Sequence, residues 1–228
     1  MFSDLAAGFL LDAPPFKLSG MVYGTLLNQQ SAIDAMGELA LKPPYNAPPK
    51  APVLYIKPRN TLAASGEIVA VPDDVDEVEV GACLGLVIAR TACKVTAPSA
   101  LDFVAGYLAV NDLSVPHPNY YRPSIRYKAR DGFCPLGAMT HCDLIANPDE
   151  LVVRTFIDDV LAAEANTSGS LRNLSTLLRD VTDFMTLAPG DILAIGVAGH
   201  APRARRGQTV RIQIEGLETL TTPLGANL

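Results

Sequence analysis

The sequence lacks a surplus of basic residues and any long apolar run. Its 18 Lys and Arg stand against 24 Asp and Glu, for a net charge of -6 and a pI near 5.0. Nucleic acid and anionic membranes favour a basic surface, so neither is expected as a partner. A small anionic substrate is still compatible, because local arginines can oppose the global charge. No apolar run approaches the roughly 20 residues that span a bilayer.

A secretory signal and a disulfide framework are also missing. The first 15 residues have no basic n-region and no convincing cleavage site, which predicts a cytoplasmic protein. The four cysteines form no CxxC pair and show no zinc-ligand spacing, and a chain of 228 residues does not need disulfides to be stable. We therefore expect reduced thiols at Cys83, Cys93, Cys134 and Cys142.

Hydrophobic patterning predicts a β-rich α+β fold. With 49% hydrophobic residues the chain can bury a full core, and we favour one large domain. A Pro-rich loop with five prolines over 42–52 excludes regular structure there, and either covers a site or acts as a rigid connector. Strands are expected at 21–27, 52–58, 83–89, 152–158, 191–197 and 209–214, an acidic loop or edge strand at 72–79, a helix at 31–41, an amphipathic helix at 171–185, and an apolar segment at 101–110 that starts as helix.

The most informative segment spans residues 106–137, GYLAVNDLSVPHPNYYRPSIRYKARDGFCPLG. It combines acid, amide, lysine and a Gly/Pro turn after an apolar run. Five short pieces, two of them within this segment, follow one another along the chain. They are YIKPRNTL at 55–62, GLVIARTACKV at 85–95, VNDLS at 110–114, KARDGFCPLG at 128–137 and TLAPGDILAIG at 186–196. Each piece is a weak signal, but their occurrence in this order is specific.

Together these pieces resemble the fumarylacetoacetate hydrolase family, over a domain of residues 21–228 that follows an extension of residues 1–20. The resemblance implies a mixed β-sandwich roll, usually dimeric, with the site at one open end. Within the family, NDLS, YYRPSIRYK and RDGFCPLG are most similar to the branch that isomerises and decarboxylates intermediates of aromatic breakdown. This similarity implies a subunit of an isomerase/decarboxylase in 4-hydroxyphenylacetate catabolism, acting on a small di- or tricarboxylate. The subunit is expected to form a homodimer or to assemble with a paralogous subunit.

The family's chemistry implies a divalent cation, usually magnesium, which stabilises an enolate as a Lewis acid. Its oxygen ligands are a Glu-x-Glu pair on a strand and the Asp of the Asn-Asp motif, here Asp112. Alignment on GLVIA puts the two glutamate positions at Gly81 and Cys83, which cannot chelate magnesium. A Glu-x-Glu exists at Glu77 and Glu79, where it is either brought to the site by a strand slip or forms an exposed acidic edge.

Other candidate substrate-binding residues either match positions near the site in the family or carry a side chain that can bind a carboxylate. Lys128 matches a lysine that faces the substrate, although an ion pair with Asp112 or Asp131 is equally compatible with the sequence. Lys57 matches a position near the site, and Gly196 permits close backbone approach. Three arginines lie close enough in sequence to clamp a dicarboxylate, or else form a solvated basic face: Arg122, Arg126 and Arg130.

The positions of the histidines in the sequence argue against a hydrolase. Family members with a catalytic histidine carry it near the start, where this chain has Gln29 and Gln30, so the proton acceptor of a hydrolase is missing. His117 between two prolines is either an acid–base group or, more commonly, a surface loop residue. Three readings therefore stay open: an isomerase/decarboxylase centred on Lys128 and Asp112, a metal-free supporting subunit of a paralogous enzyme, and an acylpyruvate-type hydrolase.

Overall fold

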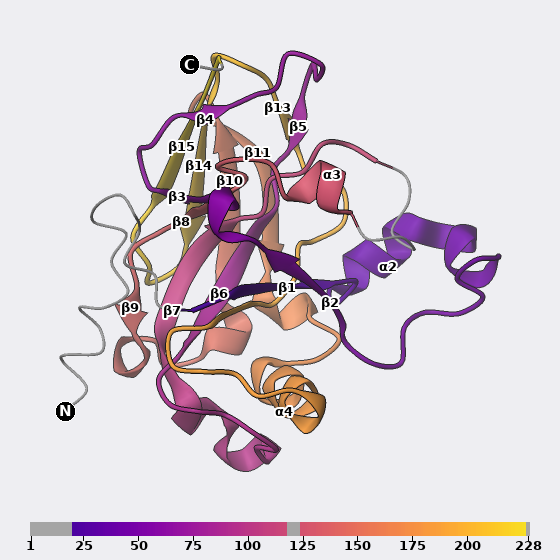
Figure 1. The fold of residues 1–228 in the computed structure, drawn as a ribbon, viewed down its shortest axis with the longest axis vertical. Helices are drawn as coiled ribbons and strands as arrows, with labels where there is room; N and C mark the ends of the chain where they lie inside the picture. The colour runs from indigo at the N-terminus through magenta and orange to yellow at the C-terminus, as the bar shows by residue number, and fades with distance from the viewer. Residues whose placement is uncertain (1–19, 118–123, 227–228) are drawn as a thin grey trace.

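The computed structural model describes residues 20–117 and 124–226, which fold into two β-sheets packed on one another (Figure 1). The larger, eight-stranded sheet has the order β2-β1-β12-β6-β7-β8-β3, with β9 paired to β7, and it mixes parallel and antiparallel neighbours. Its strands are β1 (Val22–Leu26), β2 (Val53–Lys57), β3 (Leu62–Ala64), β6 (Ala82–Ile88), β7 (Val104–Asn111), β8 (Cys134–Leu136), β9 (Thr140–His141) and β12 (Ile192–Ala194).

The second sheet has five strands in the order β11-β10-β14-β15-β4, and β5 pairs with β13 in a separate ribbon. Strands β10 and β11 form a hairpin whose two loop residues, Asp158 and Asp159, both have positive φ, as a tight primed turn requires. The strands are β4 (Val69–Ala70), β5 (Val78–Glu79), β10 (Val152–Ile157), β11 (Val160–Asn166), β13 (Arg203–Ala204), β14 (Thr209–Ile214) and β15 (Leu220–Gly225).

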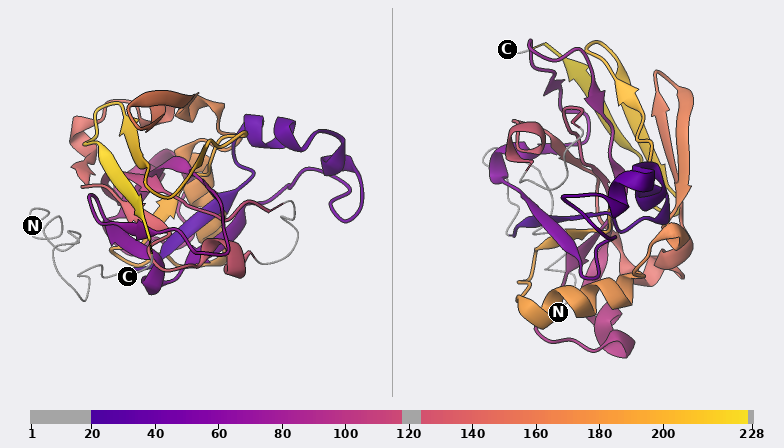
Figure 2. Two further views of the ribbon diagram at one scale, coloured as in Figure 1. Left: turned by 90° about the horizontal axis from the view of Figure 1, so that it is seen from above. Right: turned by 90° about the vertical axis from the view of Figure 1, so that its right-hand side faces the viewer.

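Three α-helices flank the sheets in the described ranges: α2 (Gln30–Met36), α3 (Ile125–Lys128) and α4 (Leu174–Phe184). In α4 the side chain of Asn173 accepts a hydrogen bond from the Thr176 backbone, which caps the helix start. Its apolar face packs at the end of the roll (Figure 2). The helix expected at 31–41 is split, since α2 is followed by a 3-10 helix at Gly37–Leu41. None of the helices in the described ranges is long and apolar enough to cross a membrane.

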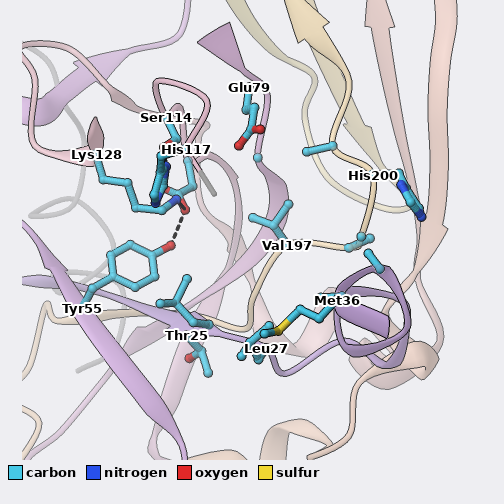
Figure 3. Close-up of a pocket in the computed structure, with 18 of the residues that line it drawn as sticks. Thr25, Leu27, Met36, Tyr55, Glu79, Ser114, His117, Lys128, Val197 and His200 are labelled. Carbon is cyan, nitrogen blue, oxygen red and sulfur yellow. Dashed lines mark hydrogen bonds and ion pairs between the residues drawn. The ribbon is translucent and has the colours of Figure 1, made fainter. Parts of the chain in front are cut away.

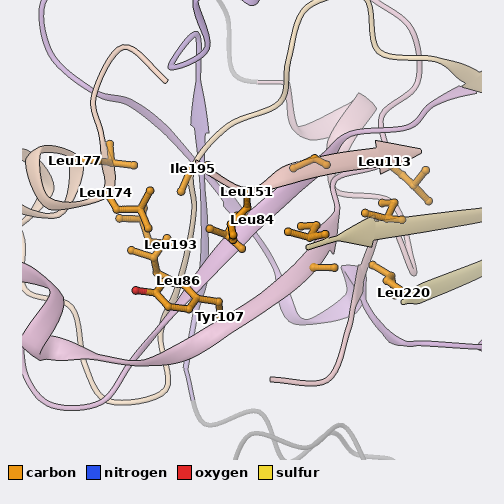
Figure 4. Packing of buried hydrophobic residues seen from close by; sticks show 14 of the residues in the cluster. Leu84, Leu86, Tyr107, Leu113, Leu151, Leu174, Leu177, Leu193, Ile195 and Leu220 are labelled. Atoms are coloured by element: carbon orange, nitrogen blue, oxygen red, sulfur yellow. The ribbon is translucent and has the colours of Figure 1, made fainter. Parts of the chain in front are cut away.

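Strand β7 is buried at all eight positions and pairs antiparallel with β6. Leu84 and Leu86 of β6 point into the core between the sheets with Leu193 and Tyr107 (Figure 4), whereas Cys83 faces the opposite side of the sheet among other apolar residues. Burial on both faces explains why β6 is a continuous apolar run in the sequence. The end of β7 is therefore rigidly held, and the segment that follows it carries the polar residues.

The projection formed by α2 and the loop after it lies outside this body (Figures 1 and 2). No residue of α2 is buried. The Pro-rich segment after it contains no strand or α-helix over residues 42–52, as the sequence predicted. A cavity lies between α2 and the end of β7.

Candidate functional site

Asp112 follows the last residue of β7 and is 2% exposed. Its Oδ1 lies 2.6 Å from the Lys57 Nζ and its Oδ2 lies 2.6 Å from the Lys128 Nζ. Lys57 ends β2 and Lys128 ends α3, so three separate elements place their charges together. The site thus contains one buried carboxylate between two ammonium groups.

The Tyr55 hydroxyl also donates a hydrogen bond to Asp112 Oδ2. Tyr55 and Lys57 are two residues apart on β2, so their side chains share a face. The Lys128 ammonium lies 4.9 Å from the centre of the Tyr55 ring, in cation–π contact. Burial, and then the Asp112 charge, raise the pKa of Tyr55 well above its usual value. The sequence analysis did not single out Tyr55, although its spacing from Lys57 in YIKP is the signal that finds it.

The Lys57 ammonium has further acceptors behind Asp112. It donates to the backbone oxygens of Leu113, Lys128 and Phe133 at 3.0, 2.8 and 2.8 Å. Burial lowers the pKa of Lys57, and the charge of Asp112 opposes that shift. Lys57 is not among the residues that line the cavity. Its geometry is that of a residue that positions Asp112 and the segment carrying Lys128.

Burial alone would raise the pKa of Asp112, but the charges of Lys128 and Lys57 outweigh it and lower the pKa to about 2. Asp112 is therefore ionised at neutral pH. Cys83 and Cys134 lie nearby and are fully buried, and burial raises the pKa of both thiols, that of Cys134 to about 12. Neither thiol is an anion at neutral pH.

The cavity beside this cluster has a volume of about 610 Å³, within the range of small-molecule sites. One wall is apolar and comes largely from α2 and the end of β1, including Leu27 and Met36 (Figure 3). Lys128 and His200 lie on opposite sides of the cavity. Its polar lining consists of Thr25, Tyr45, Tyr55, Glu79, Asp112, Ser114, His117, Lys128, His200 and Arg203.

His117 is 8% exposed and its ring stacks on Tyr127, with centroids 4.5 Å apart and planes at 4°. Its Nδ1 lies 3.0 Å from the Val115 backbone oxygen. The preference for a surface loop position was therefore wrong. The prolines beside His117 do not reveal that its ring stacks on Tyr127, which lies ten residues further along the sequence.

Neither of the two family glutamate positions offers a metal ligand, because Gly81 lines the cavity without a side chain and Cys83 is buried among apolar residues. Gly81 O accepts a hydrogen bond from Asp112 N at 2.9 Å, which fixes the register of β6 against β7. Cys83 is 3% exposed. Glu79 lines the cavity, whereas Glu77 lies 2.5 Å from Arg203 in an ion pair outside it.

Replacing Gly81 by alanine is expected to destabilise the protein by about 1–3 kcal/mol, because overpacked sites force backbone shifts. An added Cβ would lie 2.3 Å from the Asp112 backbone oxygen and 2.9 Å from Val197. Gly137→Ala is the matched control, since its Cβ would meet Ala109 at 3.5 Å, an ordinary contact. Urea unfolding of both variants measures the difference; equal midpoints would show that position 81 has room for a side chain.

The described candidates Arg126, Arg130 and Gly196 are not among the residues that line the cavity. Arg130 pairs with Asp74 at 3.3 Å and Arg126 is exposed. Gly196 has a φ of 110°, and an added Cβ would lie 2.9 Å from the Thr25 backbone oxygen. Arg122 lies outside the described residues.

In the part of the chain that the structure describes, no three metal-ligating side chains at the cavity have mutually close ligand atoms. Within residues 20–117 and 124–226, the one group of three such side chains with mutually close ligand atoms is His141, Cys142 and Asp143. His141 belongs to β9, which pairs with β7 at Gly106, near the opposite end of that strand from Asp112. His141 Nδ1 accepts a hydrogen bond from the Asp143 backbone at 3.3 Å, which caps the following turn.

Comparison with known proteins matches residues 21–224 to the family model described as fumarylacetoacetate (FAA) hydrolase, C-terminal. The chain is 38% identical over 92% of its length to the 4-hydroxyphenylacetate degradation bifunctional isomerase/decarboxylase of Salmonella dublin, and covers 48% of that protein. It spans about half the length of the curated relatives it matches.

Solved structures share the sheet-rich fold. The 5-carboxymethyl-2-hydroxymuconate delta-isomerase from Mycobacterium smegmatis matches with a TM-score of 0.77 and 29% identity, over 92% of this chain and 80% of that one. A fumarylpyruvate hydrolase from Pseudomonas aeruginosa, solved with Mn²⁺ and pyruvate, matches with a TM-score of 0.78 over 91% and 90% of the two chains. At 19% identity, that second likeness shows the fold alone. The predicted β-rich α+β roll is confirmed.

Proposed function

Since the chain belongs to the fumarylacetoacetate hydrolase family, we propose that it isomerises or decarboxylates unsaturated 2-oxo and 2-hydroxy acids in 4-hydroxyphenylacetate breakdown. The substrates proposed are 2-hydroxyhepta-2,4-diene-1,7-dioate and 5-oxopent-3-ene-1,2,5-tricarboxylate. The names of the relatives at 37–38% identity support the pathway. The single observation that carries the chemistry is the Lys128 ammonium, held by a buried carboxylate at the wall of a cavity.

Both reactions develop negative charge on the same oxygen. Tautomerisation of the dienol passes through a dienolate, and so does loss of CO₂ from C2 of the tricarboxylate, because the electron pair left on C2 is delocalised through the C3–C4 double bond onto the keto oxygen. A fixed ammonium beside that oxygen stabilises the charge without reorganising water, which makes preorganised donors effective catalysts. In the proposal, Lys128 is the catalytic residue that contacts the oxygen, and Asp112 holds Lys128 in place.

The shape of the cavity supports a substrate that is charged at both ends. Lys128 lies on one side and His200 on the other, with Met36 on the wall between them (Figure 3). Arg203 also lines the cavity. We propose that the keto-acid end of the substrate lies at Lys128, that its unsaturated carbon chain lies along the apolar wall, and that the distal carboxylate lies toward His200.

Magnesium, which the family resemblance implies, does not fit the side chains at this position. Among the described residues, Asp112 is the one carboxylate paired with the two lysines, and both of its oxygens lie 2.6 Å from ammonium groups. Gly81 and Cys83 offer no carboxylate where the family has its two glutamates. No step of the proposed reaction is therefore assigned to a metal ion.

The test is turnover of each proposed substrate by the purified chain alone, followed by ultraviolet absorbance for the dioate and by CO₂ release for the tricarboxylate. We expect turnover of at least one, and Lys50→Gln, at an exposed position away from the cavity, should match the wild type. Pyruvate release would instead indicate an acylpyruvate-type hydrolase. Turnover that appears only after addition of a paralogous subunit with an intact Glu-x-Glu would contradict the proposal and indicate a supporting subunit.

A further inference from the structure

Resting on the proposed function, we infer that this chain binds the enolate form of a 2-oxo acid without a divalent cation. The Lys128 ammonium supplies the positive charge at the oxygen. The inference rests on the ligands that the site lacks and on the charge that it has in their place.

The carboxylate of Asp112 is already neutralised on both sides. Each of its oxygens lies 2.6 Å from a lysine Nζ, and Oδ2 also accepts the Tyr55 hydroxyl. A hard cation such as Mg²⁺ prefers near-octahedral oxygen ligands at about 2.0–2.1 Å. Binding Asp112 to such an ion would place two ammonium groups against a dication. The site excludes this by charge as well as by geometry.

Position 81 cannot carry a ligand without rearrangement of the backbone. A Cβ there would lie 2.3 Å from the Asp112 backbone oxygen. Any side chain would displace the strand end that positions the carboxylate. The absence of a glutamate at position 81 is therefore built into the packing of β6 against the residue after β7.

The upstream glutamates Glu77 and Glu79 form ion pairs with arginine side chains. Arg203 lies 2.5 Å from Glu77 and 3.8 Å from Glu79, and Arg205 lies 3.8 Å from Glu77. Strands β5 and β13 pair with Arg203 opposite Glu79, so these contacts are set by the sheet register. Glu79 also lines the cavity, but its carboxylate pairs with Arg203, and in the described part of the chain no third metal-ligating atom lies close to both it and Asp112.

Two buried ammonium groups share one carboxylate, which leaves the Lys57–Asp112–Lys128 cluster with one net positive charge. Lys57 cannot offer it to a ligand, because three backbone oxygens and Asp112 surround its ammonium. Within the described residues, Lys128 Nζ donates one hydrogen bond, to Asp112 Oδ2, and it lines the cavity. An ammonium has three N–H donors. Two donors and the unbalanced charge therefore remain for an anionic ligand.

The experiment is calorimetric titration of the full chain with oxalate, a dianion that mimics the planar enolate of a 2-oxo acid. In excess EDTA we expect saturable binding, and the same affinity when the EDTA is replaced by Mg²⁺, once the free oxalate concentration is corrected for the oxalate that Mg²⁺ binds in solution. Oxalate binding that requires Mg²⁺ would overturn the inference. The absence of oxalate binding under both conditions would overturn it too, since no anion site would then exist.

Lys128→Gln should weaken oxalate binding in EDTA by about tenfold to a hundredfold, the range for hydrogen bonds to charged groups. Lys50→Gln, which removes an exposed lysine, should leave the affinity unchanged. Near-ultraviolet circular dichroism checks that Lys128→Gln is folded. Should it not fold, the wild-type comparison of EDTA with Mg²⁺ still decides the matter, because it needs no variant.

The binding experiment tests the inference and the turnover assay tests the proposed function, so that one can fail without the other. Oxalate binding in EDTA without turnover of either substrate would overturn the proposed function and leave the inference standing. Turnover that stops in EDTA and returns with Mg²⁺ would support the proposed function and overturn the inference. Turnover at an equal rate in EDTA and in Mg²⁺ supports both.

Discussion

Replacing Asp112 by asparagine is expected to lower the free energy of unfolding by about 3–5 kcal/mol, the usual cost of removing one partner of a buried ion pair. Asparagine keeps the shape of the side chain but removes the only counter-charge of two buried ammonium groups in the described cluster. Urea unfolding measures the loss. Asp74→Asn is the control, because Asp74 is exposed and its ion pair with Arg130 is a surface contact, so no measurable change is expected there.

The same residue gives the protein a pH dependence with a defined sign. The pKa of Asp112 falls from 3.8 to about 2 on folding. Its contribution is therefore fully present above about pH 4 and is lost as the pH falls toward 2. The shift corresponds to about 2 kcal/mol. Urea unfolding of the wild type between pH 5 and pH 2 should show this loss, and Asp112→Asn should show a smaller slope. Equal slopes in the two proteins would mean that Asp112 is not ion-paired in the folded state.

Replacing Lys128 by glutamine is expected to lower kcat/KM by about 10²–10³, the cost of removing one preorganised donor at a developing oxyanion. Most of the effect should appear in kcat, because the charge on the oxygen is greatest in the transition state. Stability should change less than in Asp112→Asn, since Lys57 still neutralises the carboxylate.

Steady-state kinetics on the dioate, with urea unfolding alongside, separates these effects. Lys50→Gln is the matched control for the loss of one positive charge. A value of kcat/KM for Lys128→Gln equal to that of the wild type would exclude contact between Lys128 and the reacting oxygen. A fall confined to KM would make Lys128 a binding residue that contributes equally to the ground state and the transition state.

Much of the fold was predictable because its strands have clear local signals. The run at 83–89 is apolar on both faces, and the structure makes it β6, buried between two clusters. The helix at 171–185 has a clean apolar face and forms α4. Strands β3, β4 and β8 were not predicted because each has two or three residues, too few for a period of two to show. Their pairing is fixed by neighbours far away in the sequence.

The site was predictable in its residues but not in its arrangement. Asp112 and Lys128 were found from one segment, and the contact between them spans only 16 positions. The spacing of Tyr55 from Lys57 shows that the two side chains share a face, but their contacts with Asp112 and with the backbone oxygens join segments 56–76 residues apart, so no local pattern reveals those partners. The burial of His117 likewise depends on the ring of Tyr127.

Lys57 also has a consequence for how this site can diversify. Its ammonium binds the backbone oxygens of both Leu113 and Lys128, so one side chain anchors both of these positions. Residues between the two anchors can be substituted, inserted or deleted while the anchors stay bonded to Lys57. A library randomised between these anchors would therefore vary the surroundings of the substrate on a constant charged centre. That separation makes the segment the natural place to engineer a new substrate preference.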